Sequence, residues 1–326
     1  MAWYTHPETE TPDFSPTEAA FSGFRFIRRR PGVVAVWAGV FLLYELVVTL
    51  LLIALPGKTL QAVNTFGELN QSNPEAALKM LPGVSVVLLF HSIGYLALLA
   101  ITYTASYRAL LTPSHRSPGY LRLGVDEFYM GALIVVATAL SAGYLFIVIF
   151  IGGLLAAIGS VLPPLMKALY FIAFGSALLF ALVYPFVRLS LAMPMTFMDR
   201  HVRLIESWKH TRGEFWPLLG AYLLAGVMMF LVLLAIWAIV AVLALLIILA
   251  TGGEFTSLSD LFRPDKTSLA TYLTPTTLIA EVLNAIGSAV LLIGVSGPVA
   301  EAYRALGGRF REPSPVAAKK PAEAEA

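Results

Sequence analysis

The sequence predicts an all-α integral membrane bundle of six transmembrane helices. Of its 326 residues, 58% are hydrophobic and only 13% are charged, and the mean hydropathy is +0.78. Soluble domains carry about 25% charged residues. The chain contains six apolar runs, and a helical span takes roughly 20 residues. This length is filled by one bundle, with no room for a soluble catalytic domain of ~100 residues.

The membrane domain is expected at 15–311, between two polar tails, 1–14 and 312–326, that have the composition of disordered segments. The six spans are predicted at about 33–55, 84–104, 130–154, 168–187, 218–250 and 278–299. Polar segments separate the spans, among them an outer loop at 58–80. The fifth apolar run is longer than a hydrocarbon core of about 30 Å requires, so we expect it to tilt or to project.

Two further segments have the pattern of amphipathic helices lying in the membrane plane. Ser15-Pro16-Thr17-Glu18 combines a capping residue, a proline at the first helical position and an acid two residues later, which is typical of a helix start. In the residues that follow, apolar side chains recur at helical spacing and basic side chains lie between them, so the two kinds fall on different faces of the helix. Residues 195–212 are too charged to span, but place Met198, Val202, Ile205 and Trp208 on one face.

Basic residues are sorted between the two sides of the predicted bundle. Five of the 22 Lys and Arg fall on the outer side, and the other 17 on the inner side. The five are Lys58, Lys79, Lys167, Arg263 and Lys266. Because basic loop residues near spans stay cytoplasmic during insertion, both termini are predicted in the cytoplasm.

Two patterns suggest a threefold repeat of helical hairpins. A basic residue and a glycine precede each outward span, at Gly32, Gly124 and Gly213. At the ends of the return spans, residues 106–110 (Ser-Tyr-Arg-Ala-Leu) resemble residues 302–306 (Ala-Tyr-Arg-Ala-Leu), and 186–189 form a weaker third copy. The alternative is that glycine and arginine simply mark helix ends at the inner face, where tyrosine belongs to the aromatic belt.

Four polar residues within the outer halves of the spans form the first candidate site: Glu45, His91, Glu281 and Asn284. An ionised carboxylate facing lipid is expensive, so Glu45 must be protonated, paired or turned inward. One interpretation is a polar cavity that binds a cation or relays protons. The favoured interpretation is a set of interhelical hydrogen bonds that help the helices associate.

The inner basic collar is the second candidate site, for anionic lipid head groups or a protein partner. Its members are Arg28, Arg29, Arg30, Arg108, Arg203, Lys209, Arg212 and Arg304. Nucleic acid is not expected, because topology alone accounts for basic residues so close to the spans. A protein partner and a homo-oligomer both remain open.

No catalytic, metal or cofactor site is legible. The chain has no cysteine, and its five histidines lie in different segments without a His-Glu-x-x-His pair. The sequence contains neither the Gly-x-Ser-x-Gly motif that surrounds a nucleophilic serine nor the motif of a phosphate-binding loop. An enzyme acting on lipid is therefore ranked below a binding or transport protein.

The segment 206–220, Glu-Ser-Trp-Lys-His-Thr-Arg-Gly-Glu-Phe-Trp-Pro-Leu-Leu-Gly, resembles a segment of a bacterial multi-pass family. That family is related to the membrane domain attached to some glycerophosphodiester phosphodiesterases. Trp208, Thr211, Gly213 and Phe215 match its pattern, and residues 26–31 and 121–124 fit as well. The resemblance implies a six-helix protein of the bacterial inner membrane. The phosphodiesterase barrel with its His and Glu metal motifs is absent, so no activity carries over.

The function expected from the sequence is a noncatalytic inner-membrane scaffold, membrane-organising or lipid- or partner-binding component. The alternative is a transporter or channel for a small solute, ion or lipid, using the intramembrane Glu and His cluster. A continuous polar cavity would favour transport, whereas a packed bundle with a lateral groove would favour binding.

Overall fold

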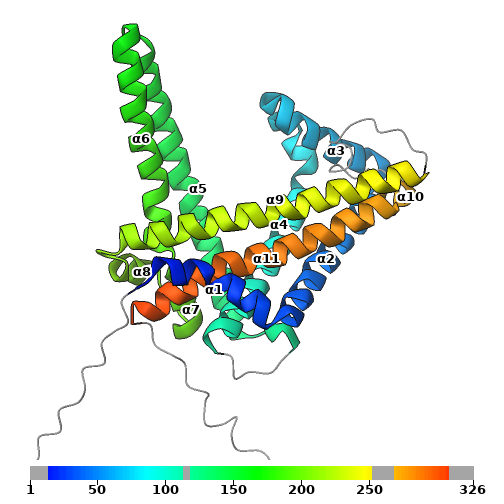
Figure 1. Ribbon diagram of the computed structural model, residues 1–326. Helices are drawn as coiled ribbons and strands as arrows, with labels where there is room; N and C mark the ends of the chain where they lie inside the picture. Colours follow the sequence, from blue (N-terminus) through cyan, green and yellow to red (C-terminus); the bar gives the residue numbers. More distant parts are fainter. Residues whose placement is uncertain (1–13, 113–117, 252–267, 308–326) are drawn as a thin grey trace, which may run out of the picture. The chain divides into compact units, whose positions relative to one another are not determined.

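The computed structural model describes residues 14–112, 118–251 and 268–307, and these form helices throughout with no strand among them (Figure 1). Eleven α-helices and one 3₁₀ helix follow one another along these residues. They are α1 (Pro16–Arg29), α2 (Pro31–Ile53), α3 (Gly57–Ser72), α4 (Pro74–Leu111), η1 (Pro118–Tyr120), α5 (Val125–Ser160), α6 (Pro164–Leu189), α7 (Ala192–Asp199), α8 (Leu204–His210), α9 (Phe215–Thr251), α10 (Leu269–Tyr272) and α11 (Pro275–Ala305). The predicted tails 1–14 and 312–326 lie outside the described residues, apart from Phe14.

Six helical stretches are long and apolar enough to cross a membrane, so the predicted fold class is confirmed. They are Pro31–Ile53, Pro74–Leu111, Val125–Ser160, Pro164–Asp199, Phe215–Leu243 and Thr277–Ala305. Most helices extend beyond the apolar windows that predicted them. The span expected at 84–104 lies inside α4, which has 38 residues. Backbone hydrogen bonding does not stop where apolar side chains stop, because polar helix formers continue it.

The predicted outer loop at 58–80 is largely helical. Helix α3 covers most of it, and α4 begins at Pro74. Asn73 ends α3, and its side-chain oxygen accepts a hydrogen bond from the Ala76 amide at 3.2 Å, which caps the start of α4. The polarity of the segment predicts a loop, but its Leu, Gln, Ala and Glu residues are good helix formers and favour the helix that is observed.

The single in-plane helix predicted at 195–212 is two helices, α7 and α8. Arg200 adopts a left-handed conformation with φ of 55° and ends α7, as left-handed residues commonly end helices. The Thr196 hydroxyl then accepts a hydrogen bond from the Arg203 amide at 3.1 Å. The apolar period continues across this break, so the pattern did not reveal it.

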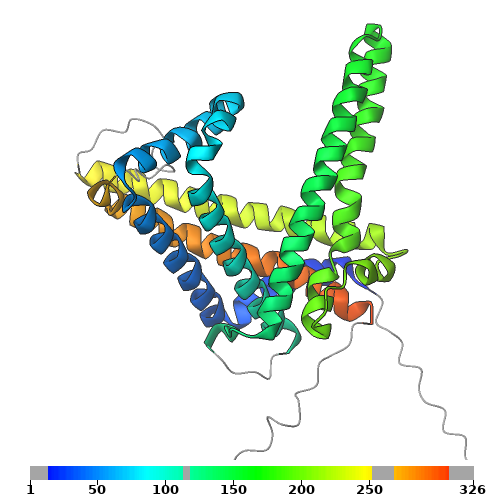
Figure 2. The same ribbon diagram turned by 180° about the vertical axis from the view of Figure 1, so that it is seen from behind.

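The chain divides into two compact units. Unit 1 comprises Met1–Gly23, Tyr103–Ala225 and Val295–Ala326, and unit 2 comprises Phe24–Thr102 and Gly226–Gly294. Unit 1 therefore contains all of α5, α6, α7 and α8, the C-terminal ends of α4 and α11, and the beginnings of α1 and α9. Within it α5 and α6 run side by side as a long hairpin (Figures 1 and 2).

Helix α1 begins as the sequence predicts and then packs closely on α11 within unit 1. The Ser15 hydroxyl accepts a hydrogen bond from the Glu18 amide at 3.4 Å, which confirms the cap. Ala19, Ala20 and Gly23 form the buried face of α1. A Cβ added at Gly297 of α11 would lie 2.6 Å from the Gly23 amide nitrogen. The two backbones can approach this closely only because both positions are glycine.

Replacing Gly297 by leucine is expected to separate α1 from α11. Backbone atoms cannot yield as a flexible side chain can, so the added atoms should cost about 1–3 kcal/mol of stability, as overpacking does. The measurement is thermal unfolding of the detergent-purified protein together with protease sensitivity of the N-terminal segment. Gly220→Leu is the matched control, because no atom lies within 4 Å of a Cβ there. Equal unfolding temperatures for the two variants would contradict the close packing.

Candidate functional site

Three arginines near the ends of the return helices share one type of contact inside unit 1. Arg108, Arg188 and Arg304 lie in the last turns of α4, α6 and α11, and we call them the return arginines. Each donates a guanidinium N–H to a backbone carbonyl of another segment, namely Tyr120, Trp208 and Leu110 respectively. The residue before each arginine is buried. These contacts support the predicted threefold repeat, which stays a prediction.

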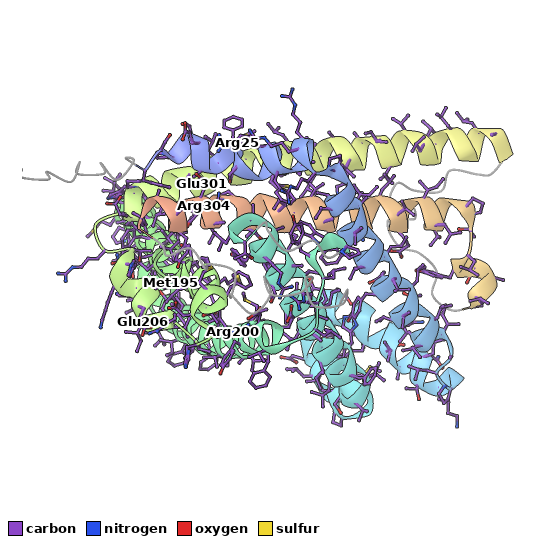
Figure 3. The ribbon with its side chains drawn as sticks, turned by 90° about the horizontal axis from the view of Figure 1, so that it is seen from below. Arg25, Met195, Arg200, Glu206, Glu301 and Arg304 are labelled. Carbon is purple, nitrogen blue, oxygen red and sulfur yellow. The ribbon has the colours of Figure 1, made fainter. Side chains whose placement is uncertain are left out.

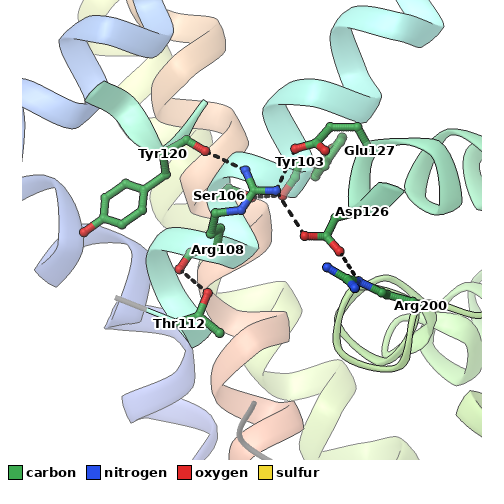
Figure 4. Close-up of polar contacts among 8 residues, drawn as sticks. All are labelled: Tyr103, Ser106, Arg108, Thr112, Tyr120, Asp126, Glu127 and Arg200. Carbon is green, nitrogen blue, oxygen red and sulfur yellow. Dashed lines mark hydrogen bonds and ion pairs between the residues drawn. The ribbon is translucent and has the colours of Figure 1, made fainter. Parts of the chain in front are cut away.

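Arg108 is neutralised by carboxylates from the start of α5 (Figure 4). Its Nη2 lies 2.7 Å from Glu127 Oε1 and 3.4 Å from Asp126 Oδ2, and its Nη1 donates to the Tyr120 carbonyl at 2.7 Å. The Arg108 side chain is only 4% exposed. Asp126 also binds the Arg200 Nε at 2.7 Å. Buried charges require such pairing, and carboxylates also suit the positive N-terminal end of α5.

The carbonyl that receives Arg108 is presented by a strained turn. Gly119 and Tyr120 both have φ near +60°, and Tyr120 is buried. Bulky residues rarely adopt this conformation, which persists only where surrounding contacts hold it. The hydrogen bond from Arg108 is one such contact.

Arg304 also has a partner of opposite charge within the chain. Glu301, one turn earlier on α11, lies 3.3 Å from Arg304 Nη1, and Figure 3 shows the two side by side. Arg304 Nη2 donates to the Leu110 carbonyl at the end of α4. A further link between α4 and α11 joins the buried hydroxyls of Ser106 and Ser296 at 2.9 Å. Hydroxyl pairs of this kind help membrane helices to associate.

Arg188 differs from the other two because it lines a pocket and meets no carboxylate among the described residues. The pocket has a volume of about 580 Å³ and is formed by α6, α8 and the start of α9, and we call it the Arg188 pocket. Its lining consists of Phe180, Tyr184, Arg188, Trp208, Lys209, Arg212, Gly213, Phe215 and Trp216. Three of these side chains are cationic, five are aromatic and none is acidic.

The Arg188 side chain is held in place by its surroundings. Its Nη2 donates to the Trp208 carbonyl at 2.6 Å, and its guanidinium carbon lies 5.2 Å from the Trp208 ring centroid and 5.9 Å from that of Tyr184. These are cation–π distances. Arg188 is 5% exposed, and its buried Nε has no hydrogen-bond partner. A buried donor without a partner costs free energy.

The local sequence explains why α8 docks against the end of α6. The hydroxyls of Ser207 and Thr211 both donate to the Arg188 carbonyl, at 3.1 and 3.0 Å. That carbonyl lies in the last turn of α6, where backbone acceptors lack helical partners. Gly213 then turns the chain into α9 with φ of +91°, a conformation that favours glycine.

The aromatic side of the pocket is a connected set of rings. The Tyr184 centroid lies 5.6 Å from that of Trp208 and 5.1 Å from that of Phe215, and Phe215 lies 5.0 Å from Trp216. Trp216 is 70% exposed at the start of a candidate span. Tryptophan at such a position is typical of the level of the lipid head groups.

Glu206, on the segment that lines the pocket, is paired with an arginine outside the lining and also interacts electrostatically with Lys209. Glu206 binds Arg203 Nη1 at 2.9 Å, and Arg203 also binds Asp199 at 3.1 Å. A hydrogen bond from its own backbone amide, and then that from Arg203, lowers the pKa of the Glu206 carboxyl. Glu206 is therefore an ionised partner of Arg203, and it does not line the pocket. Figure 3 shows Glu206 with Arg200 in the α7 and α8 region.

The eight basic residues predicted from the sequence fall into three groups. Arg108, Arg203 and Arg304 form ion pairs within the chain. Lys209 and Arg212 line the Arg188 pocket. The third group, Arg28, Arg29 and Arg30, is exposed at the junction of α1 and α2 in unit 2.

The four intramembrane polar residues all belong to unit 2 and have different surroundings. Buried Glu281 accepts a hydrogen bond from the Tyr272 hydroxyl at 3.2 Å. Burial raises the pKa of Tyr272 to about 12, and Glu281 and then Glu45 act on it in the same direction. His91 is exposed and stacks on Tyr95. Asn284 lines a separate pocket of about 160 Å³ with Trp237 and Ser288.

Sequence reasoning missed Arg188 and the aromatic residues as members of a site. Arg188 was visible as the weaker third copy of the return-helix pattern, but nothing in that pattern distinguishes it from Arg108 and Arg304. Phe180 and Tyr184 lie on α6, more than twenty residues before Trp208. Only the docking of α8 brings them to Lys209 and Arg212.

Comparisons of the chain with protein-family models, with curated proteins and with solved structures find no match. What the Arg188 pocket can do follows from its chemistry. Three cations without a lining carboxylate attract an anion, and guanidinium groups bind phosphate or carboxylate oxygens with strong, oriented hydrogen bonds. The aromatic rings provide an apolar surface beside this charge.

Removing Arg108 is expected to destabilise unit 1 severely. Arg108→Met leaves Glu127 and Asp126 without their buried partner, and such a change costs about 3–5 kcal/mol. We expect a large fall in the thermal unfolding temperature of the purified protein. The triple variant with Asp126→Asn and Glu127→Gln should recover part of the loss.

Arg200→Gln is the control for this prediction. It removes an ion pair to the same Asp126, but the Arg200 side chain is 47% exposed. Exposed pairs contribute below about 1 kcal/mol. If Arg200→Gln lowered the unfolding temperature as much as Arg108→Met, burial would not determine the strength of this network.

Proposed function

We propose that this chain is a noncatalytic multi-pass protein of the bacterial inner membrane that binds anionic lipid head groups in the Arg188 pocket. One observation carries the proposal. The pocket has three cationic and five aromatic side chains and no acidic one, and its buried arginine has a donor without a partner. An anionic head group would neutralise the charge of the lining, and its chain would lie along the rings.

The distribution of charge supports a cytoplasmic position for the pocket. Of the 22 Lys and Arg, 17 fall at the end of the predicted bundle that includes the return arginines. Basic residues near spans stay on the cytoplasmic side. The cytoplasmic leaflet is rich in anionic lipid, which such a surface attracts.

The family resemblance supports the same site. Six of the nine lining residues, from Trp208 to Trp216, belong to the segment that resembles the membrane domain associated with glycerophosphodiester phosphodiesterases. We propose that the chain is related to that family, and that this segment is a lipid-binding element. The proposal explains why Trp208, Thr211, Gly213 and Phe215 occur together. Two of them contribute aromatic rings to the pocket, one docks α8 on α6, and one makes the turn into α9.

Transport through the intramembrane polar residues ranks second. A transport site would require free polar groups facing a common cavity, but Glu281 already accepts a hydrogen bond from Tyr272, and Asn284 lines a different, small pocket. These contacts support the interpretation in which the polar residues stabilise the helices.

Neutralising the two exposed cations of the pocket is expected to weaken anionic lipid binding. Lys209→Gln with Arg212→Gln should raise the dissociation constant for phosphatidylglycerol roughly fivefold or more, about 1 kcal/mol. Neither residue forms an ion pair among the described residues, so folding should be unaffected. The measurement is a lipid titration of the purified full chain by native mass spectrometry.

The matched control is Arg122→Gln, which removes an exposed arginine of unit 1 outside the pocket. It should leave the dissociation constant unchanged. Equal losses in the control and the double variant would indicate a diffuse basic surface instead of a defined site.

The proposed orientation is tested directly because the chain has no cysteine. Thr17→Cys at the start of α1 should be protected from a membrane-impermeant maleimide in intact spheroplasts. Lys58→Cys at the start of α3 should be labelled. Both are exposed in the structure, so accessibility will report the side of the membrane. The reverse labelling pattern would invert the topology.

A further inference from the structure

The three return arginines provide an internal comparison for the ligand of the Arg188 pocket. Arg108 faces two carboxylates, Asp126 and Glu127, and Arg304 faces one, Glu301. In both cases the chain supplies the anionic oxygens, at 2.7 to 3.4 Å. Arg188 keeps the carbonyl contact that all three share, but the described residues supply no acid to it. Arg188 instead lines a pocket whose lining contains no acid.

The lining of the pocket carries three positive charges and no acid of its own. Lys209 and Arg212 accompany Arg188 in the lining, and neither forms an ion pair among the described residues. Arg108, which is buried to a similar extent, is matched by two acids and only one further cation. A lipid phosphate diester carries one negative charge. A phosphate monoester carries about −1.5 to −2 near pH 7 and has three acceptor oxygens.

On this basis, which rests on the proposed lipid-binding function, we propose that the Arg188 pocket selects lipids whose phosphate is a terminal monoester. Its terminal oxygens accept hydrogen bonds from Arg188 and Arg212 and face the Lys209 ammonium group. The second negative charge is what distinguishes this ligand from an ordinary diester lipid.

The rest of the pocket favours a lipid over a soluble phosphate ester. A volume of about 580 Å³ lies within the range of sites for whole small molecules, which is about 300–1,000 Å³. Phe180, Phe215 and Trp216 supply apolar surface, and Trp216 is exposed at the beginning of the span formed by α9. A hydrocarbon chain leaving the phosphate would follow these rings into the bilayer.

Zwitterionic head groups fit the pocket poorly. Aromatic rings often bind quaternary ammonium groups by cation–π contact. Here the Arg188 guanidinium already lies over the rings of Trp208 and Tyr184. A choline group would join three like charges with no acid in the lining to offset them, so phosphatidylcholine should be excluded.

The test is titration of the purified full chain with dioleoyl lipids followed by native mass spectrometry. At pH 7.5 we expect phosphatidic acid to bind at least tenfold more tightly than phosphatidylglycerol, and phosphatidylcholine not to bind. At pH 5.0 most phosphatidic acid has lost its second charge, whose pKa is about 6. Its affinity should then fall by up to about tenfold, towards that of phosphatidylglycerol.

The ionisable groups that line the pocket include no histidine and no carboxylic acid. They are Arg188, Lys209, Arg212 and Tyr184. His210, Glu206 and Glu214 lie on the same segment outside the lining. His210→Gln is therefore run at both pH values and should show the same pH dependence as the unmodified protein. Loss of the pH dependence in this variant would assign it to the histidine and overturn the role of the phosphate charge.

Lys209→Glu gives the chain an acid of its own at the pocket, as the other return arginines have. It should lower the affinity for phosphatidic acid by more than tenfold, and by more than Lys209→Gln does. Arg122→Glu, the same reversal outside the pocket, should have no effect. sn-Glycerol 3-phosphate, at the concentration of the lipid, should not compete, and effective competition would overturn the choice of a lipid.

The outcomes separate this inference from the proposed function. If phosphatidylglycerol or cardiolipin binds as tightly as phosphatidic acid at pH 7.5 and Arg212→Gln weakens all three, the pocket binds anionic lipid without selecting a monoester. If no lipid depends on Lys209 or Arg212, both the selectivity and the proposed function are wrong.

Discussion

The buried charge of Arg108 is the constraint on which the arrangement of unit 1 depends. A guanidinium that is almost fully enclosed must be neutralised, so the acids at the start of α5 have to lie against the end of α4. This contact positions α5, which packs on α6 and α7. The end of α6 in turn presents the Arg188 carbonyl that receives α8. The contacts of Arg108 with α5, of α5 with α6 and of α6 with α8 therefore together position the residues that line the Arg188 pocket.

The three return arginines combine a shared type of backbone contact with different side-chain partners. The arginine-to-carbonyl hydrogen bond recurs because each return helix ends beside another segment whose carbonyl lacks a helical partner. The group that neutralises each arginine can differ from site to site, since it is a single side chain such as Glu127 or Glu301. A fold built in this way can change one site without losing the other two. The Arg188 position shows what such a change produces, namely an enclosed cation with space beside it.

The sequence was sufficient for the six spans and the start of α1, because apolar runs and capping residues are local signals. It was insufficient for α3, where polarity concealed good helix formers, and for the break at Arg200, where the apolar period runs on across a left-handed residue. Lys209 and Arg212 were expected to bind lipid from their charge alone. The pocket itself forms where aromatic rings from α6 lie beside α8 and α9. No local sequence pattern predicts that arrangement.

The length of the α5 and α6 hairpin has a mechanical consequence for the bilayer. At 1.5 Å per residue, the 36 residues of α5 extend about 54 Å, whereas the hydrocarbon core is about 30 Å thick. Its far end still carries exposed apolar side chains, including Ile158 and Leu165, and these are unsuited to water. The hairpin must therefore lie steeply inclined or thicken the lipid around it. Either adjustment has a modest free-energy cost, and the chain should therefore concentrate where the bilayer is thickest.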